Sequence, residues 1–185
     1  MNKDQKLLEE AYQSIYENVV EPLYFGPPER KQEFLDLLSM LDHEVHKDGS
    51  VSVNKDVELS NMQLKRIPFN FKEAKEDFYC NRNKLTSLEG APENVGGIFY
   101  CTDNELTSLQ GAPTKVGSHF YCSRNEITSL EGAPENIGGK FESNNFSDED
   151  YRKNILHERK RKLLQKKVSK ELDKEFDVDY LWAVG

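Results

Sequence analysis

The sequence predicts an α/β solenoid in which short coils stack along one axis between helical flanks. The triplet Phe-Tyr-Cys occurs three times at a fixed interval of 21 residues, beginning at Phe78, Phe99 and Phe120. Thr-Ser-Leu and Gly-Ala-Pro return behind each triplet at the same interval, and amphipathic segments flank the repeats on both sides. Repetition at one period without insertions is typical of stacked coils, which display function on a surface rather than in a deep pocket.

Each repeat is predicted to form a short strand with one face turned inward. Phe and Cys alternate with Tyr and with polar residues, which is the period expected of a strand. Two further columns of Leu and Val or Ile are expected to close the far side of each coil. The three cysteines share one inward column, so we interpret them as small buried hydrophobic residues and not as disulfide partners. The inward columns are Phe78/Phe99/Phe120, Cys80/Cys101/Cys122, Leu85/Leu106/Ile127, Leu88/Leu109/Leu130 and Val95/Val116/Ile137.

An asparagine column needs a separate explanation. Asn83, Asn104 and Asn125 occupy one position of the repeat. Because a buried carboxamide is costly without hydrogen-bond partners, we expect each to bond backbone groups of its own coil and the next. The column is therefore predicted to form a ladder along the solenoid.

The repeat resembles the leucine-rich-repeat pattern L-x-x-L-x-L-x-x-N/C-x-L, with Phe and Cys replacing two leucines. More closely, L-T-S-L-x-G-A-P-x-x-V-G-G-x-F-x-C-x-x-N resembles the repeats of leucine-rich-repeat proteins in large tailed bacteriophages, and it is similar to the bacterial-type repeats of secreted effectors. The resemblance spans residues 57–146. It implies a short right-handed solenoid with a parallel sheet. It also implies an accessory role in the host bacterial cytoplasm, such as binding and neutralising a host or defence protein.

The solenoid is expected to cover residues 51–146, with a degenerate first coil from Val57. Residues 1–50 are predicted to form a helical cap of two helices, the second running from Pro28 to about His46. The alternative for the first helix is that it docks on a partner.

The C-terminal flank is predicted to be a basic helix over residues 147–176, followed by an acidic and apolar tail over 177–185. Residues 152–170 contain nine Lys or Arg and one Glu, a charge of +8. Because the whole chain has a net charge of −8, the remaining residues carry −16. This helix pairs with the chain's own acidic surface, or is a solvated helix, or contacts a protein or nucleic acid. In the solvated case the residues expected to face the solenoid are Leu156, Leu163, Leu164, Val168 and Leu172. The tail either folds back or anchors another chain. Candidate contact residues are Arg159, Lys160, Arg161, Lys162 and Trp182.

The main candidate binding site is the outward face of the predicted sheet. If Phe and Cys point inward, the tyrosine between them points to solvent, and side chains that vary between coils flank it. A row of Tyr residues beside variable positions is how a solenoid presents a protein-binding surface. The predicted concave site comprises Tyr79, Tyr100, Tyr121, Ile98, His119, Arg82, Asp103 and Arg124.

Catalysis has little support in the sequence. It contains no phosphate-binding loop, nucleophile elbow or H-E-x-x-H helix, and His43 and His46 lack a third ligand placed nearby. No apolar run is long enough to span a membrane. We therefore expect a cytoplasmic, non-enzymatic protein-interaction module without cofactor or metal, whose partner is a host or phage protein. The alternatives are a virion structural or assembly component and a nucleic-acid-associated protein that uses the basic helix.

Overall fold

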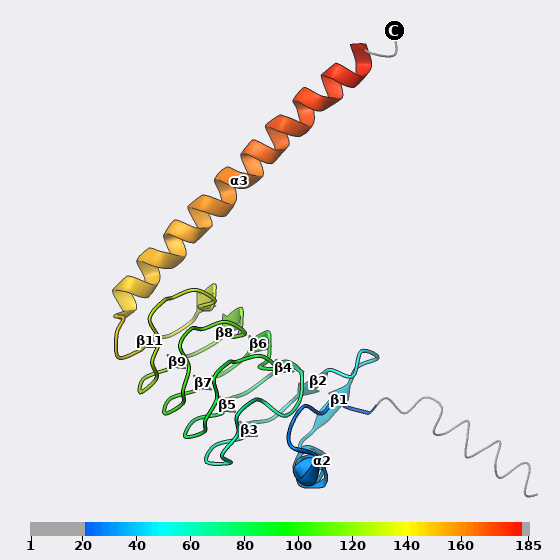
Figure 1. The fold of residues 1–185 in the computed structure, drawn as a ribbon, viewed down its shortest axis with the longest axis vertical. Helices are drawn as coiled ribbons and strands as arrows, with labels where there is room; N and C mark the ends of the chain where they lie inside the picture. The colour runs from blue at the N-terminus through cyan, green and yellow to red at the C-terminus, as the bar shows by residue number, and fades with distance from the viewer. Residues whose placement is uncertain (1–20, 183–185) are drawn as a thin grey trace, which may run out of the picture. The chain divides into compact units, whose positions relative to one another are not determined.

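The computed structural model describes the backbone of residues 21–182 and the side chains of residues 21–172 (Figure 1). The first predicted helix, within residues 1–20, lies outside the described residues. The chain divides after Asn145 into two units, the solenoid and a C-terminal helical unit, which are described separately.

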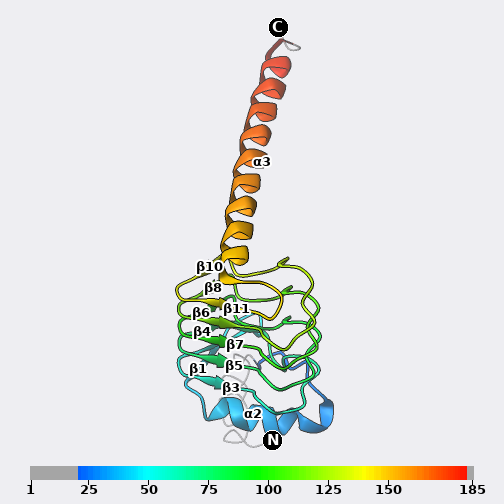
Figure 2. The same ribbon diagram turned by 90° about the vertical axis from the view of Figure 1, so that its left-hand side faces the viewer.

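The first unit is a solenoid of parallel strands, which confirms the predicted fold class (Figure 2). Its five-stranded sheet has neighbouring strands exactly one repeat apart, so that Phe78 faces Phe99 and Phe99 faces Phe120. The strands that follow β1 pair in parallel in both sheets, whereas β1 and β2 are antiparallel. The five-stranded sheet contains β3 (Val57–Glu58), β5 (Phe78–Tyr79), β7 (Phe99–Tyr100), β9 (Phe120–Tyr121) and β11 (Phe141–Glu142). The six-stranded sheet contains β1 (His43–Val45), β2 (Val51–Val53), β4 (Phe71–Ala74), β6 (Asn94–Val95), β8 (Lys115–Val116) and β10 (Asn136–Ile137).

The six-stranded sheet is an addition to the predicted architecture. The sequence analysis placed one strand in each repeat and left Val95 to close the far side of the coil. Val95 instead lies in β6, four residues before Phe99 in β7, so each of these coils bends sharply between two strands. Gly96 stands at that bend, where an added Cβ would collide with the carbonyl oxygen of Lys75 in the preceding coil. Only glycine allows this close backbone approach.

The core consists of the predicted columns. The phenylalanine rings stack almost parallel from coil to coil, with centroids 5.5 Å apart between Phe78 and Phe99 and 5.3 Å apart between Phe99 and Phe120. The three cysteines are free and buried, and burial raises the pKa of each thiol above its usual value. They therefore act as small apolar residues, as predicted.

The asparagine ladder is present, although the hydrogen bonds of each asparagine reach back to the preceding coil and not forward to the next. The Asn104 amide nitrogen donates to the carbonyl oxygens of Cys80 and Cys101 at 3.0 and 3.1 Å, and its side-chain oxygen accepts from the Leu85 N–H at 3.0 Å. Each asparagine thus joins its own coil to the preceding coil, not to the next as predicted. Asn83 and Asn125 repeat this arrangement.

The N-terminal flank is less helical than predicted. A 3₁₀ helix, η1 (Pro28–Arg30), leads into α2 (Lys31–Ser39), and the chain then forms β1 instead of continuing as a helix to His46. The prediction was wrong there because β1 pairs with β2 across a turn in which Gly49 has a φ of 76°, a non-local contact that local helical periodicity does not reveal.

The helix α2 packs against the first coil. Phe34 of α2 is fully buried, and its ring lies 5.9 Å from that of Tyr24, which in turn contacts Phe69. The Arg30 guanidinium donates to the Met62 carbonyl oxygen at 2.7 Å. These contacts cover the N-terminal end of the solenoid.

The second unit contains one long helix, α3 (Asp148–Trp182). Ser147 caps it: the Asp150 N–H donates to the Ser147 hydroxyl at 3.1 Å, while the Ser147 N–H donates to the Asp150 carboxylate at 2.9 Å. The helix continues beyond residue 176, so the expected start of the tail lies inside it. None of the helices in the described part of the chain is long and apolar enough to cross a membrane.

Candidate functional site

The outer side of the five-stranded sheet carries a row of tyrosines, Tyr79, Tyr100 and Tyr121, which we call the tyrosine face. Their rings are half-buried and tilted against one another, with centroids 6.3 Å apart in the first pair and 5.2 Å in the second. The sequence analysis expected exposed side chains, but mutual packing covers part of each ring. The row is consequently an ordered surface, because each tyrosine restricts its neighbour.

Tyr79 is held at one end of this row by an acidic side chain. Its hydroxyl donates to one carboxylate oxygen of Asp77 at 2.7 Å, and the other oxygen accepts from the Ile98 N–H at 2.6 Å. The hydrogen bond to Asp77, together with burial, raises the pKa of Tyr79 to about 12. Asp77 therefore fixes the tyrosine and also joins two coils. Ile98 contributes its backbone to this contact and a half-buried side chain to the face.

His119 extends the row at its other end. Its ring lies 5.7 Å from that of Tyr121, and its Nδ1 accepts a hydrogen bond from the backbone N–H of Lys140 at 3.0 Å. An accepting Nδ1 places the ring proton of the neutral imidazole on Nε2. His119 thus supports Tyr121 and presents an N–H donor.

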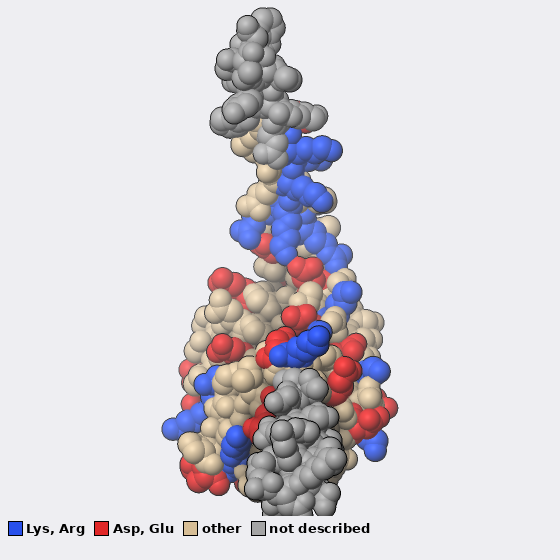
Figure 3. Space-filling model, turned by 90° about the vertical axis from the view of Figure 1, so that its right-hand side faces the viewer, with Lys and Arg blue, Asp and Glu red and all other residues tan. Residues whose placement is uncertain are grey.

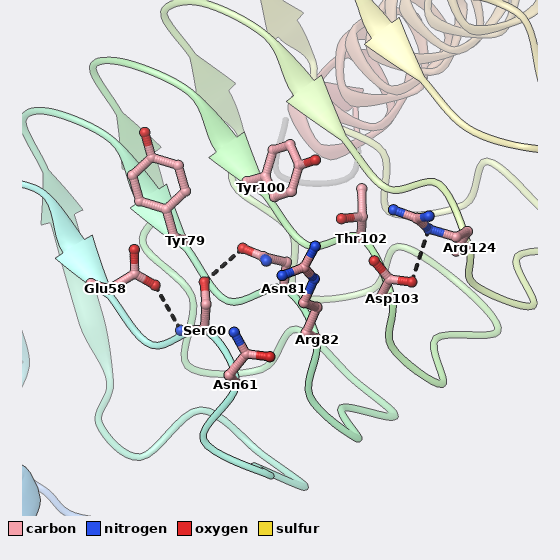
Figure 4. A pocket seen from close by; sticks show the side chains of 10 residues that line it. All are labelled: Glu58, Ser60, Asn61, Tyr79, Asn81, Arg82, Tyr100, Thr102, Asp103 and Arg124. Carbon is pink, nitrogen blue, oxygen red and sulfur yellow. Dashed lines mark hydrogen bonds and ion pairs between the residues drawn. The ribbon is translucent and has the colours of Figure 1, made fainter.

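A hollow of about 550 Å³ opens beside the tyrosine row, where the strands pass into turns (Figure 4). It brings together five of the predicted site residues from three successive coils: Tyr79, Tyr100, Arg82, Asp103 and Arg124. Ile98, His119 and Tyr121 do not line it. Five residues outside the predicted set of site residues complete the lining, namely Glu58, Ser60, Asn61, Asn81 and Thr102.

Charge alternates along the wall of this hollow. Arg124 pairs with Asp103 through Nε and Oδ1 at 2.8 Å. Arg82, one coil before Asp103, makes no ion pair within the described part of the chain, and its side chain extends into the hollow (Figure 4). The site therefore offers one cation whose charge is not neutralised by a neighbour.

Thr102 adds a polar atom that has no partner. The residue is 4% exposed, and its Oγ1 is the one buried side-chain nitrogen or oxygen atom in the described residues without a hydrogen bond. In the neighbouring coil the equivalent Asn81 accepts from the Ser60 hydroxyl at 2.6 Å. An unsatisfied buried hydroxyl costs about 1–3 kcal/mol. A ligand group that reached Thr102 would remove this cost.

The backbone of the charged wall is strained. Arg82, Asp103 and Arg124 have φ values of 54°, 56° and 55°, in the left-handed region that disfavours side chains. This conformation costs roughly 1–2 kcal/mol per non-glycine residue. Arg82 and Arg124 carry no sequence signal of it, because arginine is not a residue typical of left-handed turns. Glycine would fit the backbone better but would remove the charged groups from the hollow.

The basic residues of the C-terminal flank lie on α3 (Figure 3). Arg161 pairs with Glu158 at 2.7 Å, and Arg159, Lys160 and Lys162 are exposed on the same helix. Trp182 ends the helix, and its side chain lies outside the described residues.

No group of three or more His, Cys, Asp or Glu side chains that could hold a metal ion occurs among the residues described. His43 lies in β1, and His46 bonds the Ser52 hydroxyl at 2.7 Å, so these two histidines serve the local structure.

The fold defines the class of this protein as a parallel β-solenoid with a long helical extension. Comparisons with protein-family models, with curated proteins and with solved structures found no match for the chain. The functional argument therefore depends on the chemistry of the tyrosine face and the hollow.

Proposed function

We propose that the protein is a non-enzymatic protein-binding module that uses the tyrosine face and the adjoining hollow. The observation that supports this proposal is the ordered row of tyrosines, which lies beside an unpaired Arg82 and an unsatisfied Thr102 hydroxyl. Tyrosine provides a large contact area with a polar tip, and Tyr and Arg are enriched among residues that dominate binding energy. Packing within the row reduces the entropy that binding would otherwise cost.

The dimensions and chemistry of the face suit one segment of a partner protein. Adjacent strands lie about 4.8 Å apart, so four coils span roughly 15–20 Å, enough for one helix or an extended peptide. The segment would lay apolar groups on the tyrosines and place a carboxylate or carbonyl acceptor near Arg82 and Thr102. The resemblance of the repeats to those of phage leucine-rich-repeat proteins adds the proposal that the partner is a host or phage protein in the bacterial cytoplasm.

The direct test replaces Tyr79, Tyr100 and Tyr121 together by Ser. Partner binding should fall by several kcal/mol, because two hot-spot tyrosines contribute about 2 kcal/mol or more each. Circular dichroism should still report the folded solenoid, since the Phe and Cys columns remain. Quantitative pull-down from host lysate, followed by a titration with the purified partner, measures the loss.

A matched control uses the same 21-residue spacing on another part of the coils. Glu89, Gln110 and Glu131 have exposed side chains, and their joint replacement by Ser should leave binding unchanged. Equal binding by the two triple variants would remove the tyrosine face from consideration.

Two other roles start from the sequence and do not use this face. A virion structural or assembly component would be detected by mass spectrometry of purified virions. A nucleic-acid-associated protein would bind through the basic residues of α3, with an affinity that falls steeply as salt is added.

A further inference from the structure

The helix α3 carries large apolar side chains that are exposed. Leu163, Leu164 and Val168 are 61%, 62% and 58% exposed, and Leu156 and Leu172 are 55% and 49% exposed. A helix of 35 residues is about 50 Å long. Helices in proteins derive most of their stability from packing an apolar face, and exposed apolar clusters mark interaction sites. The apolar residues of α3 therefore call for a partner.

Three of these residues form one ridge. Leu164, Val168 and Leu172 follow one another at intervals of four, which places them in a row on one side of the helix. Rows of this kind interlock when two helices cross. Leu163 projects from a different side, although it is as exposed as Leu164.

Charge along α3 changes sign near the ridge. Residues 152–170 carry +8, whereas the following residues 171–179 contain five acidic residues and one lysine, a charge of −4. Among the described residues, Lys160, Lys166, Lys167 and Lys170 make no ion pair. Side chains on one helix reach only three or four positions, so most of the two oppositely charged segments cannot meet within one straight helix.

We propose that α3 binds the α3 of a second copy in antiparallel orientation, crossing at Val168. Leu164 of each copy then faces Leu172 of the other, and the two Val168 side chains meet on the twofold axis. In this register residues 157–165, with a charge of +3, lie opposite residues 171–179 of the second copy, with −4. A parallel arrangement would instead place the two +8 segments side by side.

The same helix has the charge to attract nucleic acid, but a second copy suits it better. Phosphates would neutralise the lysines and leave the Leu164–Leu172 ridge in water, whereas the antiparallel pair buries the ridge and balances the charge. The −16 of the remaining chain also repels phosphates. This inference is independent of the proposed partner of the tyrosine face.

Analytical ultracentrifugation of the full chain tests the proposal. The wild type should form a dimer whose fraction rises with concentration between about 1 and 100 µM. Leu164→Gln should weaken the dimer at least about tenfold, because each dimer loses two buried leucines. Leu163→Gln is the matched control and should change dimerisation less than about twofold, since Gln retains helix propensity at both sites. A monomeric wild type, or equal effects of both substitutions, would overturn the proposal.

Cysteine pairing and salt test the orientation. A chain with Leu164→Cys, mixed with a chain with Leu172→Cys, should form a mixed disulfide readily, while Leu164→Cys alone should not. The native cysteines are buried and do not compete. Added salt should weaken an antiparallel dimer, which gains from opposite charges, and should strengthen a parallel one. Self-pairing of Leu164→Cys, or a dimer that salt strengthens, would contradict the antiparallel arrangement.

Discussion

The solenoid and α3 are stabilised in opposite ways. In the solenoid, stacked side chains and backbone groups contact partners in an adjacent coil, as the Phe78–Phe99 stack and the bond from Asn104 to Cys80 illustrate. In α3 the ion pairs that are resolved join residues three or four positions apart, and the leucines are exposed. The comparison teaches that the solenoid contains its own core, whereas the helix exposes an apolar surface, for which we propose a second copy as the partner.

The largest expected difference between the two regions is the loss of stability when a large apolar side chain is replaced by alanine. Phe99→Ala should lower the free energy of unfolding by about 3–5 kcal/mol, because Phe99 is fully buried and stacks on a ring on each side. Leu163→Ala on α3 should change it by less than about 0.5 kcal/mol, since Leu163 is exposed. Urea unfolding followed by circular dichroism measures both. Similar losses would show that α3 has a core contact within the chain.

A second expected effect concerns the asparagine ladder. Asn104→Ala should destabilise by roughly 1–3 kcal/mol, because the Leu85 N–H and the Cys80 and Cys101 carbonyls lose a buried partner. Asn94→Ala, in the same repeat but half-buried in β6, should be much milder. Thermal unfolding of the two variants decides the matter, and equal shifts would contradict the structural role of the ladder.

The unsatisfied hydroxyl of Thr102 predicts an effect of the opposite sign, a gain in stability. Thr102→Val keeps the shape of the side chain and removes the unsatisfied hydroxyl, so we expect stability to rise by about 1 kcal/mol while partner binding weakens. Ser60→Ala is the control, because the Ser60 hydroxyl bonds Asn81 and its loss should not stabilise the protein. Destabilisation by Thr102→Val would mean that the hydroxyl has a partner in solution.

The smallest expected effect concerns Arg82. Arg82→Asn should leave stability unchanged or raise it by up to about 0.5 kcal/mol, because Asn tolerates a φ of 54° better than Arg. Binding of an acidic partner segment should nevertheless fall, since the unpaired cation is lost. Calorimetric titration with the purified partner measures this fall. Unchanged binding would exclude Arg82 from the site.

Periodicity explains which parts of the fold could be predicted from the sequence. The Phe, Cys and Asn columns were predictable because each member has an identical neighbour one repeat away, and identical residues in stacked coils must meet. Most of the six-stranded sheet was missed because a strand such as Asn94–Val95 is followed directly by two glycines and shows no alternation, whereas Phe99–Tyr100 is followed by Cys101. The β1 strand was taken for helix because its partner β2 lies across a turn.

The candidate site was predictable only in part, for similar reasons. The outward direction of Tyr79, Tyr100 and Tyr121 followed from the alternation with Phe and Cys. The unsatisfied hydroxyl of Thr102 and the left-handed backbone at Arg82 did not, because they depend on how the turns of adjacent coils approach one another. Repetition predicts what identical positions share, and the hollow depends on positions that differ between coils.

Hydrogen exchange across a dilution series tests most directly whether the solenoid is stabilised within one chain and α3 by a second copy. Amides of β5, β7 and β9 should remain protected at every concentration, while amides around Val168 should lose protection on dilution together with the dimer. Protection around Val168 that does not depend on concentration would contradict the account, because α3 would then be stable without a second copy.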